Sequence, residues 1–273
     1  RAQSPGDAPP AGPAAGPAAP APTPSFARNP KAFLQAKGFD LSFSWADIYQ
    51  GTISGDPEDL SEHSGRIALG LTIDGEKIGL WRGFGISAVG EAIYGDTGLL
   101  HAPILLPVNT ALLFPGVGGR DADVSVTVSQ RFGQRATVTA GRINLSTVLS
   151  RAPLLGGGGV DTFTQVMVAA PISGITPPYL AGAILNVAGG SLRYTVMVYD
   201  PRNAQSSEVW RHLFAEGVVT SVSAMRPVPI GGLLGTHTLR GVYSTGSSTD
   251  LRDIPALIRP GGPTSPLSTK QGS

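Results

Sequence analysis

The sequence has few charged residues and no cysteine. Lys, Arg, Asp and Glu make up 14% of its 273 residues, whereas a soluble globular domain averages about 25% charged residues. Soluble surfaces are built largely from these four side chains, so the chain has too few of them to cover a soluble protein of its size. The absence of cysteine excludes disulfides and thiolate metal sites, and it suits an oxidising periplasmic or cell-surface setting.

Long apolar runs are absent as well. No window holds the roughly 18 uninterrupted apolar residues that a membrane-spanning helix needs. Strong helix-forming stretches are scarce, while Gly, Ser and Thr are abundant. A chain of this composition fits either a very large β-core or a β-barrel with a lipid-facing wall. The formal net charge of +1 gives no reason to expect a nucleic-acid partner.

No catalytic or metal-binding constellation is found in the sequence. The four histidines are isolated, without an i,i+4 pair or HExxH spacing, so we expect no metal site. Neither a GxSxG nor a GxxxxGK[ST] motif occurs, and no paired carboxylates stand out. We therefore expect that the protein is not an enzyme and that it uses no cofactor.

The chain does contain many segments in which every second residue is apolar. Val124–Arg131 is the clearest, because valine at positions 124, 126 and 128 alternates with Ser or Thr. Strict alternation predicts a β-strand that is apolar on one face. About nine such segments occur, each near the ten residues that cross a bilayer at a tilt. They are Phe39–Ile53, Arg66–Asp74, Phe84–Tyr94, Val124–Arg131, Arg135–Leu145, Tyr179–Val187, Leu192–Asp200, Gly217–Arg226 and Thr236–Thr245.

Smaller signals refine this all-β interpretation. A short helix or irregular stretch is expected around Asn29–Lys37. Gly133–Gln134 predicts a tight turn, and Gly189–Gly190 predicts a two-residue hairpin turn. Near Gly141 the alternation slips by one residue, as a β-bulge would produce.

Alternation alone does not separate a barrel from a β-sandwich. The shortage of charge favours the barrel, because a sandwich turns its polar face to bulk water. Long connections rich in Pro and Gly at 95–123, 146–178 and 201–216, with a tail from Ser247, suit a barrel that carries long loops at one rim. Aromatic residues at strand ends suit interfacial girdles, although they also fit ordinary core positions; they are Trp45, Tyr49, Trp81, Phe84, Tyr94, Tyr199 and Tyr243.

The candidate functional residues are side chains on the polar faces of the strands. If those faces line a channel, opposed Arg and carboxylate groups offer hydrogen bonds to hydroxyl groups, and an aromatic ring can pack against the C–H face of a sugar. The alternative is that each residue is simply a solvated position on a strand. The candidate pore-lining set is Arg66, Asp74, Glu91, Arg131, Arg142, Arg193 and Tyr199.

One segment, Gly190–Asn203 (GSLRYTVMVYDPRN), resembles a strand of the carbohydrate-selective porin (OprB) family. Gly65–Leu80, Val138–Leu145 and Phe214–Val222 resemble the same family in the same order, so that the resemblance spans about residues 35–250. It implies a bacterial outer-membrane β-barrel for passive diffusion of glucose and similar small sugars. It also implies that Arg142 and Arg193 lie on strands that face the pore.

The expected organisation is a disordered Pro/Ala-rich linker at 1–28, a β-barrel porin domain at 29–250 and a Pro/Gly-rich loop or tail at 251–273. The family's barrel has sixteen strands and ends in a strand with a terminal aromatic residue. We therefore expect this chain to be an N-terminal portion of such a barrel.

The expected partners are small sugars and outer-membrane lipid, with self-association into a homo-oligomer left open. The alternative hypothesis is a secreted soluble β-sandwich that binds carbohydrate, which would need no detergent. An enzyme on a β-scaffold is a third hypothesis.

Overall fold

The structure is a computed structural model, and it describes residues 29–52, 61–96, 112, 121–145, 177, 179–249 and 269–271. The expected linker at 1–28 and most of the expected tail lie outside the described residues. Nine strands form one antiparallel sheet in which each strand pairs with its neighbours in sequence. Their bounds are β1 Phe39–Gly51, β2 Ser61–Asp74, β3 Phe84–Gly95, β4 Ala122–Phe132, β5 Ala136–Asn144, β6 Tyr179–Gly189, β7 Leu192–Tyr199, β8 Val219–Ile230 and β9 Leu233–Ser244.

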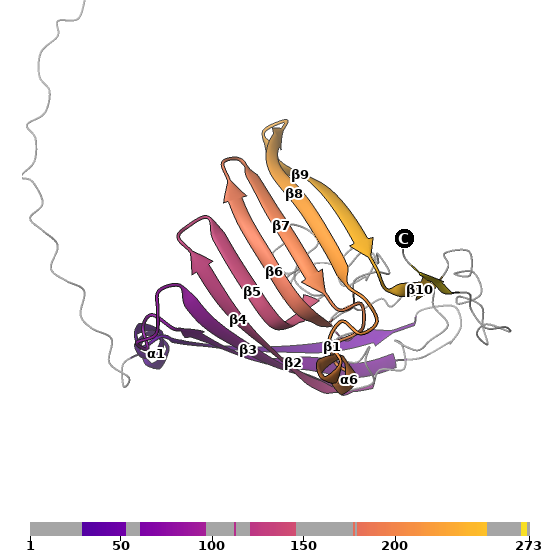
Figure 1. Cartoon of the computed structure of the whole chain (residues 1–273). Coiled ribbons are helices and arrows are strands. Elements are labelled where there is room, and N and C mark those ends of the chain that lie inside the picture. Colours follow the sequence, from indigo (N-terminus) through magenta and orange to yellow (C-terminus); the bar gives the residue numbers. More distant parts are fainter. Residues whose placement is uncertain are drawn as a thin grey trace, which may run out of the picture.

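The sheet is a single strongly curved layer (Figure 1). A β-sandwich needs two sheets packed face to face. The only other sheet among the described residues is the two-stranded pair of β10 (Ser247–Thr249) and β11 (Thr269–Gln271). The sandwich hypothesis is therefore wrong, and the predicted antiparallel barrel wall is confirmed. The β10–β11 pair was not expected in the tail.

The two ends of the strands carry different connections. At one end, strands are joined by residues 75–83, 133–135, 190–191 and 231–232, three of which are only two or three residues long. At the other end, the connections are 52–60, 96–121, 145–178 and 200–218. We call these the short-turn end and the long-loop end. The arrangement confirms the prediction of long loops at one rim.

Two helices are found among the described residues, and the first follows from local sequence signals. Helix α1 (Pro30–Ala36) has proline at its first position and an Asn29 cap, whose side chain accepts a hydrogen bond from the Ala32 N–H at 3.0 Å. It lies at the short-turn end, where the expected stretch 29–37 places it (Figure 1). Helix α6 (Ser207–Arg211) lies at the long-loop end within 201–216, which was expected to be a loop.

The turns lie close to their predicted positions. The β6–β7 hairpin turns at Gly190–Ser191, one residue later than predicted, because Gly189 still pairs with Leu192. Gly190 has a φ of 62°, which glycine adopts without the steric cost of a Cβ atom. The β4–β5 turn takes three residues, Gly133–Arg135, where two were predicted.

The sheet has an apolar face and a polar face. Residues directly opposite one another in an antiparallel pair lie on the same face, and Leu71, Ala88 and Val126 are such a row across three strands. This outer face leaves large apolar side chains uncovered, with Phe43 and Trp45 each 65% exposed. Exposed apolar residues on this scale mark a surface that contacts another apolar phase.

The inner face carries Ser, Thr and charged residues. Ser42, Thr72, Ser87 and Thr127 belong to it by register. Tyr199 also faces inward and is only 1% exposed, in a cluster with Met197 and Val219. Of the two alternatives for these aromatic residues, Tyr199 therefore takes the core position, whereas Trp45, Tyr49, Trp81 and Tyr243 are exposed as a girdle requires.

The slip predicted at Gly141 is a change in the direction of strand β5. Gly141 has a φ of 131° and is the last β5 residue paired with β4. The pairing with β6 continues without an extra residue, so the irregularity is not a bulge toward β6. Beyond it, consecutive residues 179–181 of β6 are all buried, which means that both faces of this end of the β5–β6 pair are covered.

Candidate functional site

The site is built around an ion pair between adjacent strands. Ala68 of β2 lies opposite Glu91 of β3, and Arg66 lies opposite Ile93, so Arg66 and Glu91 are diagonal neighbours on the inner face. The Arg66 guanidinium donates to the Glu91 carboxylate. The Glu91 side chain is 3% exposed and that of Arg66 is 11% exposed. Such burial of two charges is tolerable only because each has the other as a partner.

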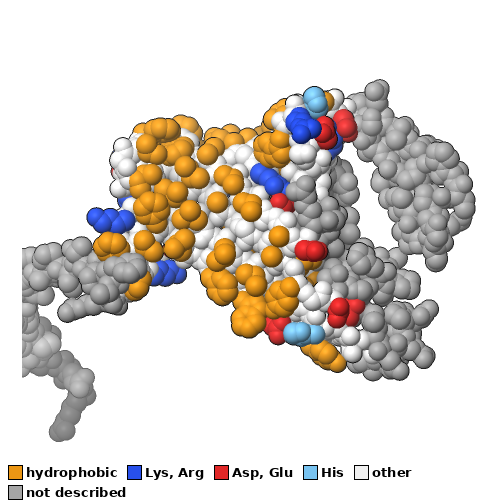
Figure 2. All heavy atoms as spheres, turned by 90° about the horizontal axis from the view of Figure 1, so that it is seen from below, with side chains coloured by type: hydrophobic (Ala, Val, Ile, Leu, Met, Phe, Trp, Pro, Cys, Tyr) orange, Lys and Arg blue, Asp and Glu red, His pale blue; other side chains and the backbone are white. Residues whose placement is uncertain are grey.

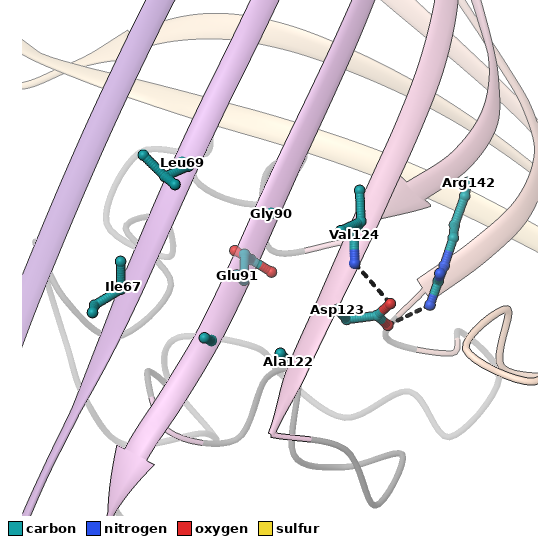
Figure 3. Close-up of a pocket in the computed structure, with 9 residues that line it drawn as sticks. Ile67, Leu69, Gly90, Glu91, Ala122, Asp123, Val124 and Arg142 are labelled. Atoms are coloured by element: carbon teal, nitrogen blue, oxygen red, sulfur yellow. Dashed lines mark hydrogen bonds and ion pairs between the residues drawn. The ribbon is translucent and has the colours of Figure 1, made fainter.

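A second ion pair lies beside the first. Asp123 of β4 is directly opposite Glu91, and its carboxylate accepts from the Arg142 guanidinium of β5 and from the Val124 N–H, the latter at 2.8 Å. Figure 3 shows the Arg142 side chain reaching toward Asp123 across neighbouring strands. Two carboxylates directly opposite each other repel, and the two guanidinium groups offset that repulsion.

Two residues from the reoriented end of β5–β6 join the ion pairs. Asn144 donates its side-chain amide to Glu91, and the Tyr179 hydroxyl donates to the same carboxylate at 3.1 Å. The Arg142 guanidinium carbon lies 5.4 Å from the centre of the Tyr179 ring, within cation–π range. We call Arg66, Glu91, Asp123, Arg142, Asn144 and Tyr179 the polar cluster.

The polar cluster can offer hydrogen bonds without carrying net charge, because its two guanidinium groups match its two carboxylates. In the described part of the chain, the Nε atoms of Arg66 and Arg142 are buried and have no acceptor. The side chains of Arg66 and Arg142 are 11% and 18% exposed, and an N–H donor at that exposed surface can bind a neutral hydroxyl oxygen. The arrangement is therefore suited to uncharged hydroxyl-bearing molecules.

The structure brings three of the seven predicted residues together, namely Arg66, Glu91 and Arg142. Asp74, Arg131 and Arg193 are exposed near the short-turn end, away from the polar cluster. Tyr199 is buried, so its ring is not open to a solute in this structure.

Sequence reasoning missed Asp123, Asn144 and Tyr179. The break in alternation at Gly141 was the one sequence feature that pointed to Asn144, because the change in strand direction there lets Arg142 and Asn144 turn toward β3 and β4.

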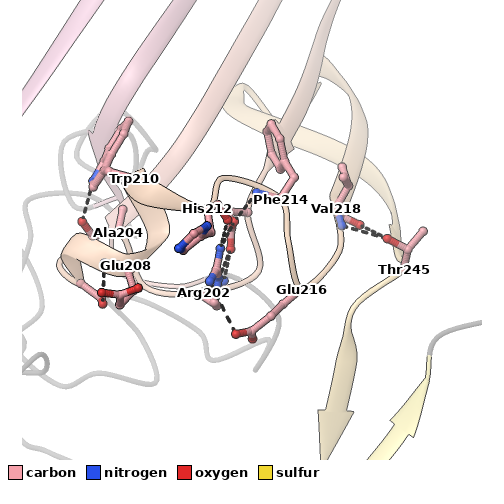
Figure 4. A network of polar contacts seen from close by, with 11 residues as sticks. Arg202, Ala204, Glu208, Trp210, His212, Phe214, Glu216, Val218 and Thr245 are labelled. Atoms are coloured by element: carbon pink, nitrogen blue, oxygen red, sulfur yellow. Dashed lines mark hydrogen bonds and ion pairs between the residues drawn. The ribbon is translucent and has the colours of Figure 1, made fainter.

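A second polar network holds the β7–β8 connection at the long-loop end (Figure 4). The Asp200 carboxylate accepts from the Arg202 side chain at 2.8 and 2.9 Å and from the Phe214 N–H at 2.7 Å. Burial raises the pKa of Asp200, but these hydrogen bonds outweigh it and hold the pKa below its ordinary value. Arg202 also donates to the His212 carbonyl at 2.6 Å. One buried carboxylate thus fixes the segment that contains α6.

Other kinds of site are not seen in the part of the chain that the structure describes. None of the helices among those residues is both long and apolar enough to cross a membrane. No group of three or more His, Cys, Asp or Glu side chains in the described ranges is placed to bind a metal ion.

Comparison with known proteins supports the fold. No protein-family model matches the chain, and no curated protein matches it. A solved structure, the high-pH structure of Pseudomonas putida OprB, is similar with a TM-score of 0.65 and 18% sequence identity. The similarity covers 90% of this chain and 62% of the OprB chain, so this chain spans about three fifths of that protein. The chain therefore has an OprB-like porin fold and forms part of such a barrel wall.

Proposed function

We propose that the protein forms the wall of a porin in the bacterial outer membrane, through which small sugars such as glucose diffuse passively. The observation that carries the proposal is the division of one curved sheet into an exposed apolar outer face and a polar inner face with a charge-balanced polar cluster. The OprB-like fold supports the same conclusion. No cofactor and no covalent chemistry are required.

The outer face fits the hydrocarbon core of a bilayer. Phe43, Leu69 and Val126 expose 65%, 60% and 47% of their surface, respectively. In water these side chains would form an apolar patch of the kind that soluble monomers avoid. In lipid they lie in a solvent as apolar as themselves, while the sheet satisfies the backbone N–H and C=O groups.

The polar cluster gives the proposed pore its selectivity. A sugar presents hydroxyl groups that must replace their bonds to water as it enters, and guanidinium N–H groups can supply such bonds. The balance between Arg66, Arg142, Glu91 and Asp123 gives an ion no net attraction. Sugar binding must stay weak, because a solute that is held tightly blocks conduction.

A closed pore also requires that the edges of the sheet be covered. In the described structure, β1 and β9 each have one neighbour in the nine-stranded sheet, so one edge of each is open. Unpaired backbone groups in lipid cost several kcal/mol each. We propose that further strands cover these edges, as expected of a chain that spans 62% of the similar OprB structure.

The test is the swelling of liposomes that contain this chain, in glucose and in a larger oligosaccharide. Rapid swelling in glucose alone is the expected result. Equal swelling in both sugars would contradict a size-limited pore. Inserted protein without swelling would show that this chain does not supply the strands needed to cover the open edges of β1 and β9. A protein that stays in solution without detergent would contradict the membrane location.

Selectivity is tested with a double variant, Arg66→Gln with Glu91→Gln, which removes one ion pair and leaves two neutral polar side chains in its place. The glucose rate relative to that of a similar-sized charged solute should fall. Arg226→Gln is the matched control, because Arg226 is exposed on the outer face, outside the polar cluster. The same change in both variants would show that the polar cluster does not set selectivity.

A further inference from the structure

The β2–β3 turn at the short-turn end combines cations with exposed apolar side chains. Ile78, Leu80 and Trp81 are 40%, 43% and 60% exposed, and they lie between the exposed cations Lys77 and Arg82. A solvated turn has no need for three large apolar residues. Lys and Arg beside Trp and aliphatic side chains are typical of the boundary between lipid tails and headgroups.

Trp81 is fixed against the outer face of the sheet. Its indole N–H donates to the Gln130 side chain at 2.7 Å, and its ring lies 4.4 Å from the ring of Phe84, centre to centre. Phe84 and Gln130 are register partners on the outer face. Trp81 therefore lies at the short-turn edge of the apolar face.

Two neighbouring segments extend this surface. Lys77 donates to the Gln35 carbonyl at 2.8 Å, which brings helix α1 against the turn. The Arg131 N–H donates to the Gly83 carbonyl at 2.8 Å, which places the β4–β5 turn on the other side. The resulting surface, which we call the basic rim patch, consists of Lys31, Lys37, Lys77, Ile78, Leu80, Trp81, Arg82, Phe132 and Arg135, and its cations are all exposed.

The charge of this end differs from that of the long-loop end. The carboxylates in the same segments are Asp40, Asp74 and Glu76, and the first two lie on the inner face by register. The outward-facing side of the patch is therefore basic. In the described part of the long-loop end, the exposed charges are mainly acidic, with Arg211 as a cation among Asp47, Asp96, Asp121, Glu208 and Glu216. Figure 2 shows the hydrophobic side chains of the outer face lying between the two ends.

We propose that the basic rim patch binds the phosphate groups of anionic phospholipids in the membrane leaflet at the short-turn end. The inference rests on the proposed membrane location but goes beyond it, because apolar burial alone requires no particular headgroup. Trp81, Ile78 and Leu80 enter the interface, while the Lys and Arg side chains reach the phosphates. Each basic residue near an anionic lipid surface strengthens binding about fivefold, and the effect weakens with salt.

The experiment measures which lipid surrounds Trp81. The full chain contains three tryptophans, so Trp45→Phe with Trp210→Phe leaves Trp81 as the only tryptophan. The protein is placed in vesicles of mixed phosphatidylglycerol and phosphatidylcholine, with bromine, a fluorescence quencher, on the acyl chains of one lipid or the other at equal mole fraction. Brominated phosphatidylglycerol should quench Trp81 about twofold more than brominated phosphatidylcholine.

Two variants serve as controls. Trp81→Phe with Trp210→Phe leaves Trp45, which lies in the middle of β1 and outside the basic rim patch, and it should be quenched equally by both lipids. Lys31→Gln, Lys37→Gln, Lys77→Gln and Arg82→Gln together should bring the quenching ratio at Trp81 to one, as should about 0.5 M salt. Arg211→Gln with Arg226→Gln should leave the ratio unchanged.

The outcomes separate this inference from the proposed function. Preferential quenching at Trp81 that disappears in the neutralised variant supports the basic rim patch. Equal quenching of Trp81 by both lipids overturns the inference and leaves the membrane location intact. If neither brominated lipid quenches Trp81 or Trp45, the membrane location is wrong and this inference falls with it.

Discussion

The Tyr179 hydroxyl donates a hydrogen bond to the Glu91 carboxylate at 3.1 Å, although the two residues are 88 positions apart in the sequence. Tyr179 begins strand β6 and Glu91 lies on β3, so the bond ties together strands that are not neighbours in the sheet. The face of the same ring lies against Arg142. One side chain thus holds a member of each buried ion pair.

Tyr179→Phe should destabilise the fold. The substitution keeps the ring against Arg142 but removes a donor to a buried carboxylate, a bond worth about 1.5–3 kcal/mol. We expect the free energy of unfolding in detergent, measured by urea titration, to fall by about that amount. Tyr243→Phe is the matched control, because Tyr243 is 56% exposed on the outer face. Equal effects of the two substitutions would show that the bond to Glu91 contributes nothing.

The Asp123–Arg142 ion pair should show strong coupling between its partners. Loss of one partner leaves a buried unpaired charge and costs about 3–5 kcal/mol, whereas loss of both leaves two neutral groups. Asp123→Asn and Arg142→Gln should therefore each destabilise the protein more than the double variant does. Urea unfolding of the three variants measures the coupling. If the two single effects simply add in the double variant, the ion pair is not coupled in the folded state.

The sequence predicted the strands well, because alternation of apolar and polar residues is imposed by the two faces of the sheet. The prediction failed where apolar and polar residues do not alternate, because such a segment does not show which of its faces is apolar. The first residues of β2, Ser61–Gly65, are polar or small on both faces, so the strand was predicted to start at Arg66. Strand β8 runs on to Ile230 through Pro227 and Pro229, residues that normally argue against a strand.

The polar cluster was only partly predictable. Arg66, Glu91 and Arg142 were recognised because each is a charge on a polar strand face. Which of the seven candidates meet depends on register between strands and on the reorientation after Gly141, and neither can be calculated from alternation. Tyr179 was missed because the alternation of residues does not show that its hydroxyl group meets Glu91 of a strand that is not its neighbour.

Gly141→Ala should be strongly destabilising. A Cβ atom at Gly141 would lie 2.4 Å from the Val126 carbonyl oxygen, and the φ of 131° is one that side-chain-bearing residues rarely adopt. Because Arg142 and Asn144 follow directly, the polar cluster should be disturbed as well. Gly241→Ala is the matched control, since a Cβ atom there meets nothing within 4 Å. Thermal unfolding of the two variants compares them, and equal melting temperatures would contradict the account of the β5 reorientation.

The Asp200 network should make the β7–β8 connection sensitive to acid. The pKa of Asp200 is lower in the folded protein than its ordinary value of 3.8. Its stabilising contribution is therefore fully present above the ordinary value and is lost as the pH falls through the lower, folded value. Trp210 lies in this segment and donates to the Ala204 carbonyl at 3.1 Å. With Trp45→Phe and Trp81→Phe in place, its emission reports the segment, and it should change only below about pH 4.

Asp200→Asn should remove this acid transition, because no carboxylate remains to be protonated. The variant should also loosen the segment at neutral pH, because the hydrogen bonds from Arg202 and Phe214 to the carboxylate are lost. Glu216→Gln is the control, since Glu216 is exposed and lies 3.5 Å from Arg202, where an ion pair contributes little. It should keep the wild-type acid transition. Were Asp200→Asn to follow the same pH profile as the wild type, another group would be responsible, and Asp200 would not be the residue that fixes this loop.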